Sequence, residues 1–86
     1  MVDLDQAFES AAAAASNLSQ DPGNEVKLKL YGLYKQATVG DAGGKRPGVF
    51  DPVGRAKFDA WAQLAGTTPE DAKREYVHLV EELGSS

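Results

Sequence analysis

The sequence predicts an all-α protein, built as a four-helix bundle that forms a single domain over residues 1–86. Four stretches carry apolar residues at helical spacing, and each has a helix start or stop signal beside it. No stretch shows the apolar–polar alternation of a strand over a useful length. The 86 residues, 42% of them hydrophobic, suffice for one modest core.

The first helix is expected directly after Asp3, a residue type that caps helix N-termini. A run of five alanines gives this segment a high helix propensity and a thin profile. The turn signal Asp21-Pro22-Gly23 follows it. The apolar positions at helical spacing are Leu4, Phe8, Ala11, Ala12, Ala15 and Leu18.

The second helix is predicted from Asn24 to about Val39, with two stripes along it. Its core stripe consists of Val26, Leu30, Leu33 and Ala37. About a third of a turn away, a second stripe carries Lys27, Tyr31, Tyr34, Lys35 and Thr38. The solvent-facing side is assigned to Glu25, Lys29, Gly32 and Gln36.

A glycine-rich loop, residues 40–48, separates this helix from the third. The third helix starts at Asp51-Pro52, an N-cap followed by proline at the first helical position, and Gly66 ends it. Its inward or sideways positions are Ala56, Lys57, Ala60, Trp61 and Leu64. Thr68-Pro69 repeats the start signal, and Gly84 is the expected stop of the fourth helix. One face of that helix carries Ala72, Tyr76, Leu79, Val80 and Leu83.

Charge is segregated along the chain, although the net charge is only −4. Residues 1–25 hold five acidic and no basic side chains, residues 26–57 hold seven basic and two acidic ones, and the remainder is acidic again. A basic centre suits a compact anionic ligand. Nucleic acid would meet repulsion from both acidic ends, so we do not expect it as a partner. An ordinary solvated surface is the alternative interpretation.

The residues offer little for catalysis. The chain has no cysteine, and its only histidine, His78, is expected on the exposed side of the fourth helix. Adjacent Glu81 and Glu82 face different directions, and nothing has the spacing of a metal site. We therefore expect neither an enzyme nor a cofactor. Without an apolar membrane span or a signal peptide, a soluble cytoplasmic protein is expected.

Tyr31, Tyr34 and Lys35 suggest a binding face. A phenol combines an apolar ring with a hydrogen-bonding tip, and an ammonium attracts phosphate. Lys57, in the same basic segment, could converge on them, so a phosphorylated, ring-bearing ligand fits. The alternative is that the tyrosines are half-buried packing residues covered by the Lys35 stem. The residues alone leave both interpretations open.

Several motifs resemble the acyl-CoA-binding protein family: YKQATVGD from Tyr34, KRPG from Lys45, AKFDAW from Ala56, and GTTPEDAKREYVHLVEEL from Gly66. The resemblance implies an up-down-down-up bundle that binds long-chain fatty acyl-CoA esters one to one. It also implies a monomeric carrier and buffer in fatty acid metabolism, without stable membrane insertion and with transient contacts to acyl-CoA-using enzymes. A helical protein-interaction module and an acyl-CoA-sensing regulatory module are the alternatives.

The resemblance also implies a set of ligand contacts. Tyr31 and Lys35 would contact the ribose 3′-phosphate and neighbouring groups, and Lys57 would join the phosphate contacts. Tyr34 would line the nucleotide site, and Tyr76 would help to enclose the ligand. Family lysines are replaced here by Ser16 and Val53, and a family tryptophan by Phe58. The peripheral site candidates are Ser16, Lys27, Leu28 and Phe58, with Lys27 a possible substitute for one lost charge.

Overall fold

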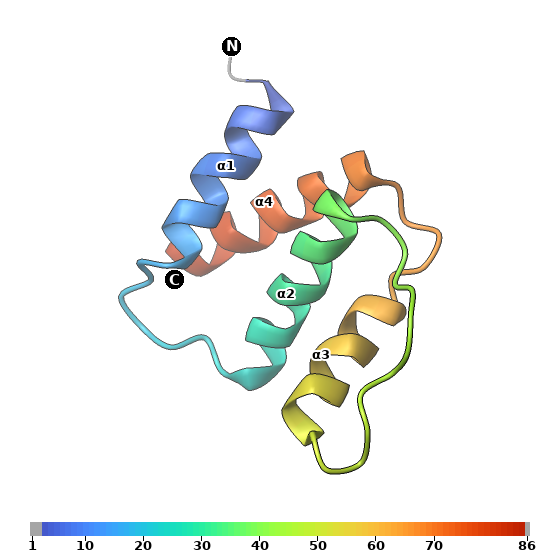
Figure 1. Ribbon diagram of the computed structural model, residues 1–86. Helices are drawn as coiled ribbons and strands as arrows, with labels where there is room; N and C mark the ends of the chain where they lie inside the picture. The colour runs from blue at the N-terminus through green and yellow to red at the C-terminus, as the bar shows by residue number, and fades with distance from the viewer. Residues whose placement is uncertain (1–2, 86) are drawn as a thin grey trace.

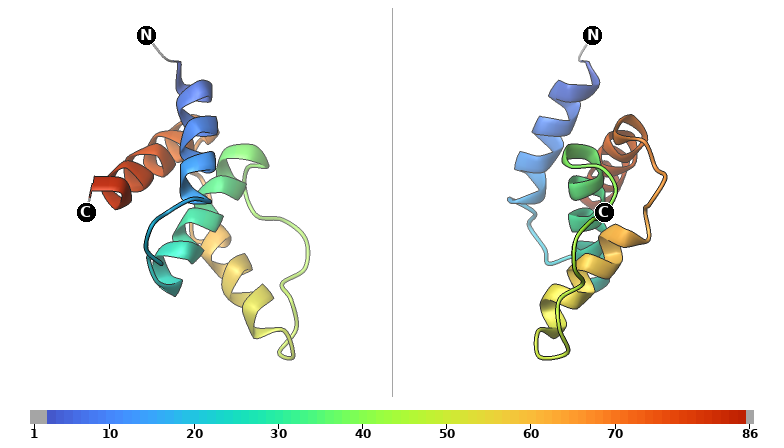
Figure 2. Two further views of the ribbon diagram at one scale, coloured as in Figure 1. Left: turned by 90° about the vertical axis from the view of Figure 1, so that its left-hand side faces the viewer. Right: turned by 45° about the vertical axis from the view of Figure 1, so that its right-hand side comes forward.

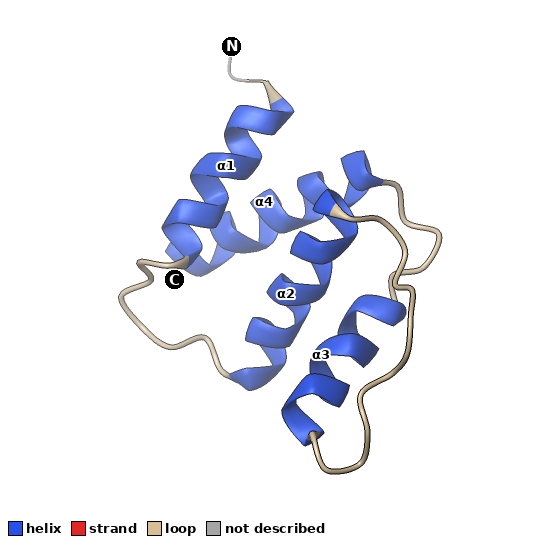
Figure 3. Cartoon of the chain, in the orientation of Figure 1, coloured by secondary structure: helices blue, strands red, loops and turns tan. Residues whose placement is uncertain are grey.

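The computed structural model describes residues 3–85, and within them the chain forms four helices and no strand (Figure 1). The helices are α1 (Leu4–Ala15), α2 (Asn24–Thr38), α3 (Pro52–Ala62) and α4 (Pro69–Ser85). The predicted all-α fold class is confirmed, and Figure 3 shows the helices joined by loops alone. Met1, Val2 and Ser86, which the predicted domain includes, lie outside the described residues.

Three of the four predicted helix starts are made by side-chain caps, and α2 begins after Gly23 without one. The Asp3 carboxylate accepts a hydrogen bond from the Gln6 N–H at 2.8 Å, and Asp51 accepts one from the Gly54 N–H at 3.0 Å. The Thr68 hydroxyl accepts one from Asp71 at 3.1 Å. Each cap satisfies a backbone donor that the first helical turn leaves unpaired.

The predicted ends of the first and third helices lie too late in the chain. α1 ends at Ala15, before Leu18, and α3 ends at Ala62, because residues 63–66 form a turn instead of a last helical turn before Gly66.

The other two predicted ends also differ from the structure. α2 ends at Thr38, one residue before the expected Val39. Gly84 does not stop α4, because the helix continues to Ser85. A glycine favours a helix stop where the backbone turns left-handed, and Gly84 is not among the described glycines that have a positive φ.

The helices follow the predicted up-down-down-up order. α4 packs against both α1 and α2, and α3 packs against α2. α2 and α3 run in the same direction (Figures 1 and 2). The segment that joins them must therefore run back from the end of α2 to the level of its beginning, where α3 starts. The long loop between Thr38 and Pro52 makes this return.

The core lies where α1, α2 and α4 meet. Its buried hydrophobic residues are Phe8, Ala11, Leu30, Leu33, Ala37, Ala72, Tyr76 and Val80. Val26, Leu79 and Leu83 pack against them half-buried, so the predicted apolar stripes face inward. None of the residues of α3, all of which the structure describes, is fully buried.

The prediction that Gly32 and Gln36 face solvent is wrong. Both are buried, and Gln36 has no exposed surface. A Cβ at Gly32 would lie 2.7 Å from the Ala60 carbonyl oxygen, so the missing side chain allows α3 to approach α2. The Gln36 amide nitrogen donates hydrogen bonds to Asp41 at 2.7 Å and to the Thr67 carbonyl at 2.8 Å. The second half of the side assigned to solvent is therefore occupied by other parts of the chain, whereas Glu25 and Lys29 in its first half are exposed as predicted.

The loop after α2 is fixed at its beginning. The Trp61 indole N–H donates to the Gly40 carbonyl at 2.7 Å, and the Gly66 N–H donates to the Asp41 carboxylate at 3.0 Å. The bond from Gly66, and then the one from Gln36, hold the pKa of Asp41 below its usual value. These contacts hold residues 40–41 against the end of α3 and the α3–α4 turn.

No helix within residues 3–85 has the length and apolar character needed to cross a membrane.

Candidate ligand-binding site

A cavity of about 390 Å³ lies between α2 and the beginning of α3. Its lining is mostly apolar, with a small number of polar groups, as is common in small-molecule sites. The lining residues are Asn24, Lys27, Leu28, Tyr31, Pro52, Val53, Ala56 and Lys57. Four residues predicted for the site (Lys27, Leu28, Tyr31 and Lys57) therefore meet at this cavity.

Tyr31 and Lys57 come together across the α2–α3 junction. The Lys57 ammonium lies 5.4 Å from the centre of the Tyr31 ring, within the range of a cation–π contact. Tyr31 is half-buried and Lys57 is exposed. The pair therefore presents a ring and a positive charge at the cavity, which are the groups expected to meet a phosphorylated ring.

Lys35 lies one helical turn beyond Tyr31, outside the cavity lining. Its ammonium lies 5.1 Å from the centre of the Trp61 ring, so it also crosses from α2 to α3. Phe58 lies beside Trp61 on α3, with the two ring centres 6.5 Å apart. Two lysines of the basic segment thus lie on aromatic rings at the same helix junction.

Tyr34 lies in different surroundings from Tyr31. The two positions are about 60° apart around the helix, and Tyr34 meets α1 and α4 instead of α3. Its ring centre lies 5.5 Å from Phe8 and 6.1 Å from Tyr76. Tyr76 is only 5% exposed, whereas Tyr34 is 42% exposed. Burial, followed by the neighbouring Tyr34 phenol, raises the pKa of Tyr76. The structure does not bring Tyr34 and Tyr76 to the cavity that Tyr31 lines.

Lys27 and Ser16 line a second hollow, of about 300 Å³, between the end of α1 and the beginning of α2. The Lys27 ammonium lies 2.8 Å from an Asp21 carboxylate oxygen, and both side chains are more than half exposed. The hydrogen bond from Lys27, followed by the one from the Gly23 N–H, lowers the pKa of Asp21. This ion pair was not predicted from the sequence, although the acidic residue in the turn before α2 was the available signal.

Asn24, Pro52 and Ala56 also line the cavity without having been predicted. Ala56 was assigned an inward or sideways position, which was the available signal for it. Asn24 and Pro52 were recognised only as helix starts. They meet at the cavity because α2 and α3 begin next to each other, and the sequence alone does not show that arrangement.

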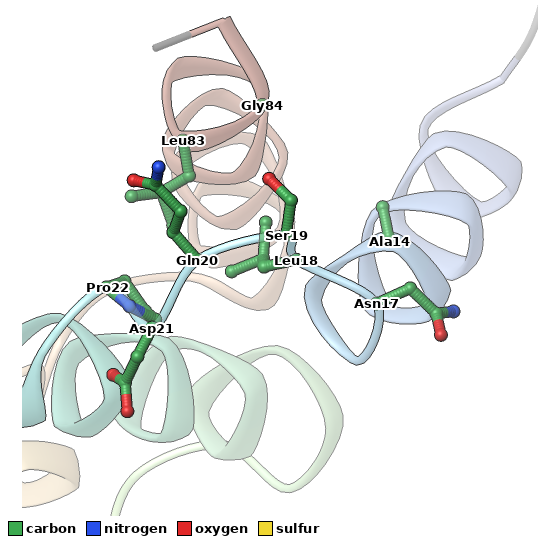
Figure 4. Close-up of a pocket in the computed structure, with 9 residues that line it drawn as sticks. All are labelled: Ala14, Asn17, Leu18, Ser19, Gln20, Asp21, Pro22, Leu83 and Gly84. Carbon is green, nitrogen blue, oxygen red and sulfur yellow. The ribbon is translucent and has the colours of Figure 1, made fainter.

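Two other hollows differ in character. One of about 520 Å³ shares Leu28 and Ala56 with the cavity and continues along the α2–α3 junction. Its other lining residues are Glu25, Lys29, Asp59, Ala60, Gln63 and Leu64. The second, of about 420 Å³, lies between residues 14–22 and the end of α4 (Figure 4). Its one charged lining residue is Asp21, so this hollow does not suit an anion.

The remaining polar side chains do not form a catalytic group at the cavity. His78 is exposed, as predicted, and its ring nitrogen lies 2.9 Å from Glu82 on the same helix. Within residues 3–85, no three carboxylate or imidazole groups lie close enough together to hold a metal ion. The cavity lining contains two lysines, a phenol and an amide as its polar side chains.

Comparison with known proteins decides the family. A sequence profile described as "Acyl CoA binding protein" matches residues 5–80. The chain belongs to the acyl-CoA-binding protein family. The chain is 49% identical over 76 residues to "Acyl-CoA-binding protein homolog 1" of Caenorhabditis elegans, covering 88% of each chain. The crystal structure of Oryza sativa Acyl-CoA-Binding Protein 2 superposes with a TM-score of 0.90 at 44% identity, covering 94% of this chain and 90% of that one.

Other members of the family are longer. The chain is 53% identical over 81 residues to "Enoyl-CoA delta isomerase 2" of Rattus norvegicus, which covers 94% of this chain. It spans only 21% of that relative's length. The family resemblance seen in the motifs is therefore confirmed, and the domain also occurs as part of a larger protein.

Proposed function

We propose that this chain binds long-chain fatty acyl-CoA esters one to one and carries and buffers them without catalysing a reaction. The observation that carries the proposal is the α2–α3 cavity, where Tyr31 and Lys57 adjoin an apolar lining in a chain of this family. The two kinds of surface correspond to the two halves of the ligand.

The cations would bind the nucleotide half. Lys57 and Lys35 both reach across the α2–α3 junction and rest on aromatic rings, which orders their side chains before a phosphate arrives. Tyr31 would contribute its ring face or its hydroxyl to the same group. Tyr34 and Tyr76, whose rings lie near Phe8 where α2 meets α1 and α4, would support this arrangement from there.

The apolar lining would bind the fatty tail. Leu28, Val53 and Ala56 form an apolar wall, and Ala60 and Leu64 extend it in the neighbouring hollow that shares Leu28 and Ala56. Each buried CH₂ group stabilises a complex by about 0.8 kcal/mol, so the tail can supply most of the affinity. The charged groups would then fix the orientation.

We further propose that the protein works as a monomer in the cytoplasm and needs no cofactor. The isomerase activity named for the rat relative is outside this proposal, because the matched region is about a fifth of that protein. A carboxylate or imidazole base, which general acid–base chemistry commonly uses, is missing from the described cavity lining.

Calorimetric titration with palmitoyl-CoA, CoA and palmitate tests the proposal. We expect palmitoyl-CoA to bind far more tightly than either half, because both surfaces of the site contribute only to the intact ester. Equal affinities for palmitate and palmitoyl-CoA would contradict it. A stoichiometry other than one to one would contradict the carrier arrangement described above.

A further inference from the structure

The exposed apolar side chains of the protein concentrate at one place. Of the five large apolar side chains that are exposed in the described residues, three lie within residues 49–53. They are Val49, Phe50 and Val53, with exposed fractions of 69%, 99% and 64%. We call these three residues the apolar tip. Phe50 is almost fully in water, which a packing role within the chain does not explain.

The apolar tip lies at an end of the molecule. It includes the last residues of the long loop and the first turn of α3, and this region projects beyond the other helices in Figures 1 and 2. A protruding group suits a surface that can deform around it. A lipid bilayer accepts such a group without a matching pocket, whereas a protein partner would need a concave surface.

Charge around the apolar tip favours an anionic surface. Residues 45–57 hold four basic side chains and one acidic side chain, Asp51. Lys45 and Lys57 are exposed, while Arg46 makes a bidentate pair with Asp59 at 2.6 and 2.9 Å. The Asp51 carboxylate caps α3. In the sequence, two exposed lysines therefore flank the apolar side chains, a combination that binds anionic lipid through insertion and attraction together.

The apolar tip is continuous with the ligand cavity, because Val53 belongs to both. We propose that the apolar tip docks this protein on anionic phospholipid surfaces, with Phe50 inserted among the lipids. Docking would place the cavity beside the layer into which an amphiphilic acyl ester partitions. This last consequence rests on the proposed function, whereas the docking itself does not require a ligand.

Vesicle flotation with the ligand-free full chain tests the docking. One set of vesicles contains phosphatidylcholine alone and the other contains phosphatidylcholine with phosphatidylglycerol. We expect the wild type to float with the anionic vesicles, more weakly with the neutral ones, and less as salt rises. Phe50→Ser should lower the partition coefficient about tenfold, since a whole aromatic side chain is lost from the inserted group. Lys45→Gln should lower it about fivefold on the anionic vesicles.

Val39→Ser is the matched control. Val39 is also exposed, at 61%, but it lies beyond the C-terminal end of α2, away from the apolar tip. This variant should float like the wild type. Absence of flotation for the wild type would overturn the proposal. Equal flotation of the wild type and Phe50→Ser would also overturn it, and would leave the apolar tip as a contact surface for a protein.

A separate measurement distinguishes the docking proposal from the proposed function. Titration of Phe50→Ser with palmitoyl-CoA in vesicle-free buffer should give the wild-type affinity, because Phe50 does not line the cavity. Loss of lipid binding with retained acyl-CoA binding supports the docking proposal. Loss of both would show that Phe50 supports the fold or the ligand site, and would contradict it.

Discussion

α2 is held differently on its two sides. Towards α1 and α4, Leu33 and Ala37 are only 1% and 6% exposed and join a continuous apolar core. Towards α3, the contacts are a glycine against a backbone carbonyl and two lysines on aromatic rings, and no residue of α3 within the described chain is fully buried. Apolar burial is non-directional and scales with area, so the α4 side supplies stability. The α3 side leaves polar and apolar surface open, so it supplies a site.

The largest expected effect separates stability from binding. Leu33→Ala should lower the free energy of unfolding by about 2–5 kcal/mol, because it opens a cavity in the core. The ratio of acyl-CoA to CoA affinity should stay unchanged under conditions where the variant is folded. Urea unfolding and calorimetric titration measure the two quantities.

Leu28→Ala is the matched control, since Leu28 is half-buried and lines the ligand cavity. It should cost less stability and more affinity than Leu33→Ala. If both variants lost stability and affinity in the same proportion, the two sides of α2 would not have separate roles.

A second prediction concerns Lys35. Removing one partner of a desolvated charge pair costs about 2–5 kcal/mol, so Lys35→Ala should weaken acyl-CoA binding by an amount in this range. It should weaken binding of the 3′-dephospho ligand much less, and leave unfolding nearly unchanged. Calorimetry of both proteins with both ligands completes the cycle. Lys45→Ala, at an exposed loop position that lines none of the hollows described above, is the control. The same loss with both ligands would assign Lys35 to another group.

A third prediction tests how closely α3 must approach α2. Gly32→Val should destabilise the fold by about 1–3 kcal/mol and weaken ligand binding, because a Cβ there meets the Ala60 carbonyl. Gly84→Ala is the control, since nothing lies within 4 Å of a Cβ at that helical position. It should stabilise the protein by up to about 1 kcal/mol. Thermal unfolding of both variants is the measurement. A Gly32→Val protein as stable as the wild type would show that α3 adjusts freely.

The smallest expected effect concerns Ser16. Ser16→Lys should strengthen acyl-CoA binding by less than about 1 kcal/mol, because the position is exposed and the gain is screened by salt. Titration at low and high salt measures it, with Ser10→Lys on exposed α1 surface as the control. An unchanged affinity at low salt would mean that position 16 lies outside the reach of the ligand.

Local signals predicted the helices well. Asp3, Asp51 and Thr68 cap helices in the structure because capping depends on residues three positions away, which the sequence displays directly. The apolar spacing also identified the α1, α2 and α4 residues that form the core. Tyr31 and Lys57 were expected to converge, and the structure places them 5.4 Å apart.

Contacts between distant segments were not visible in the same way. Gln36 was assigned to solvent because it shares a helix face with Glu25 and Lys29. Its partners, Asp41 and Thr67, belong to the following loop and the α3–α4 turn. Gly32 likewise carries no sign of the helix that approaches it. The separation of Tyr31 from Tyr34 depends on which helix lies on each side of α2, and periodicity alone does not determine that.

The fixed beginning of the long loop makes its middle replaceable. Gly40 and Asp41 are held by Trp61 and Gly66, and Asp51 caps α3, so the chain is anchored on both sides of Gly43 and Gly44. A Cβ at either glycine meets nothing within 4 Å. Lengthening a loop costs little, about 0.6 kcal/mol for each doubling. A peptide tag or a fluorescent reporter inserted between Gly43 and Gly44 should therefore leave the bundle intact. The insertion would allow the protein to be labelled without changing its helices.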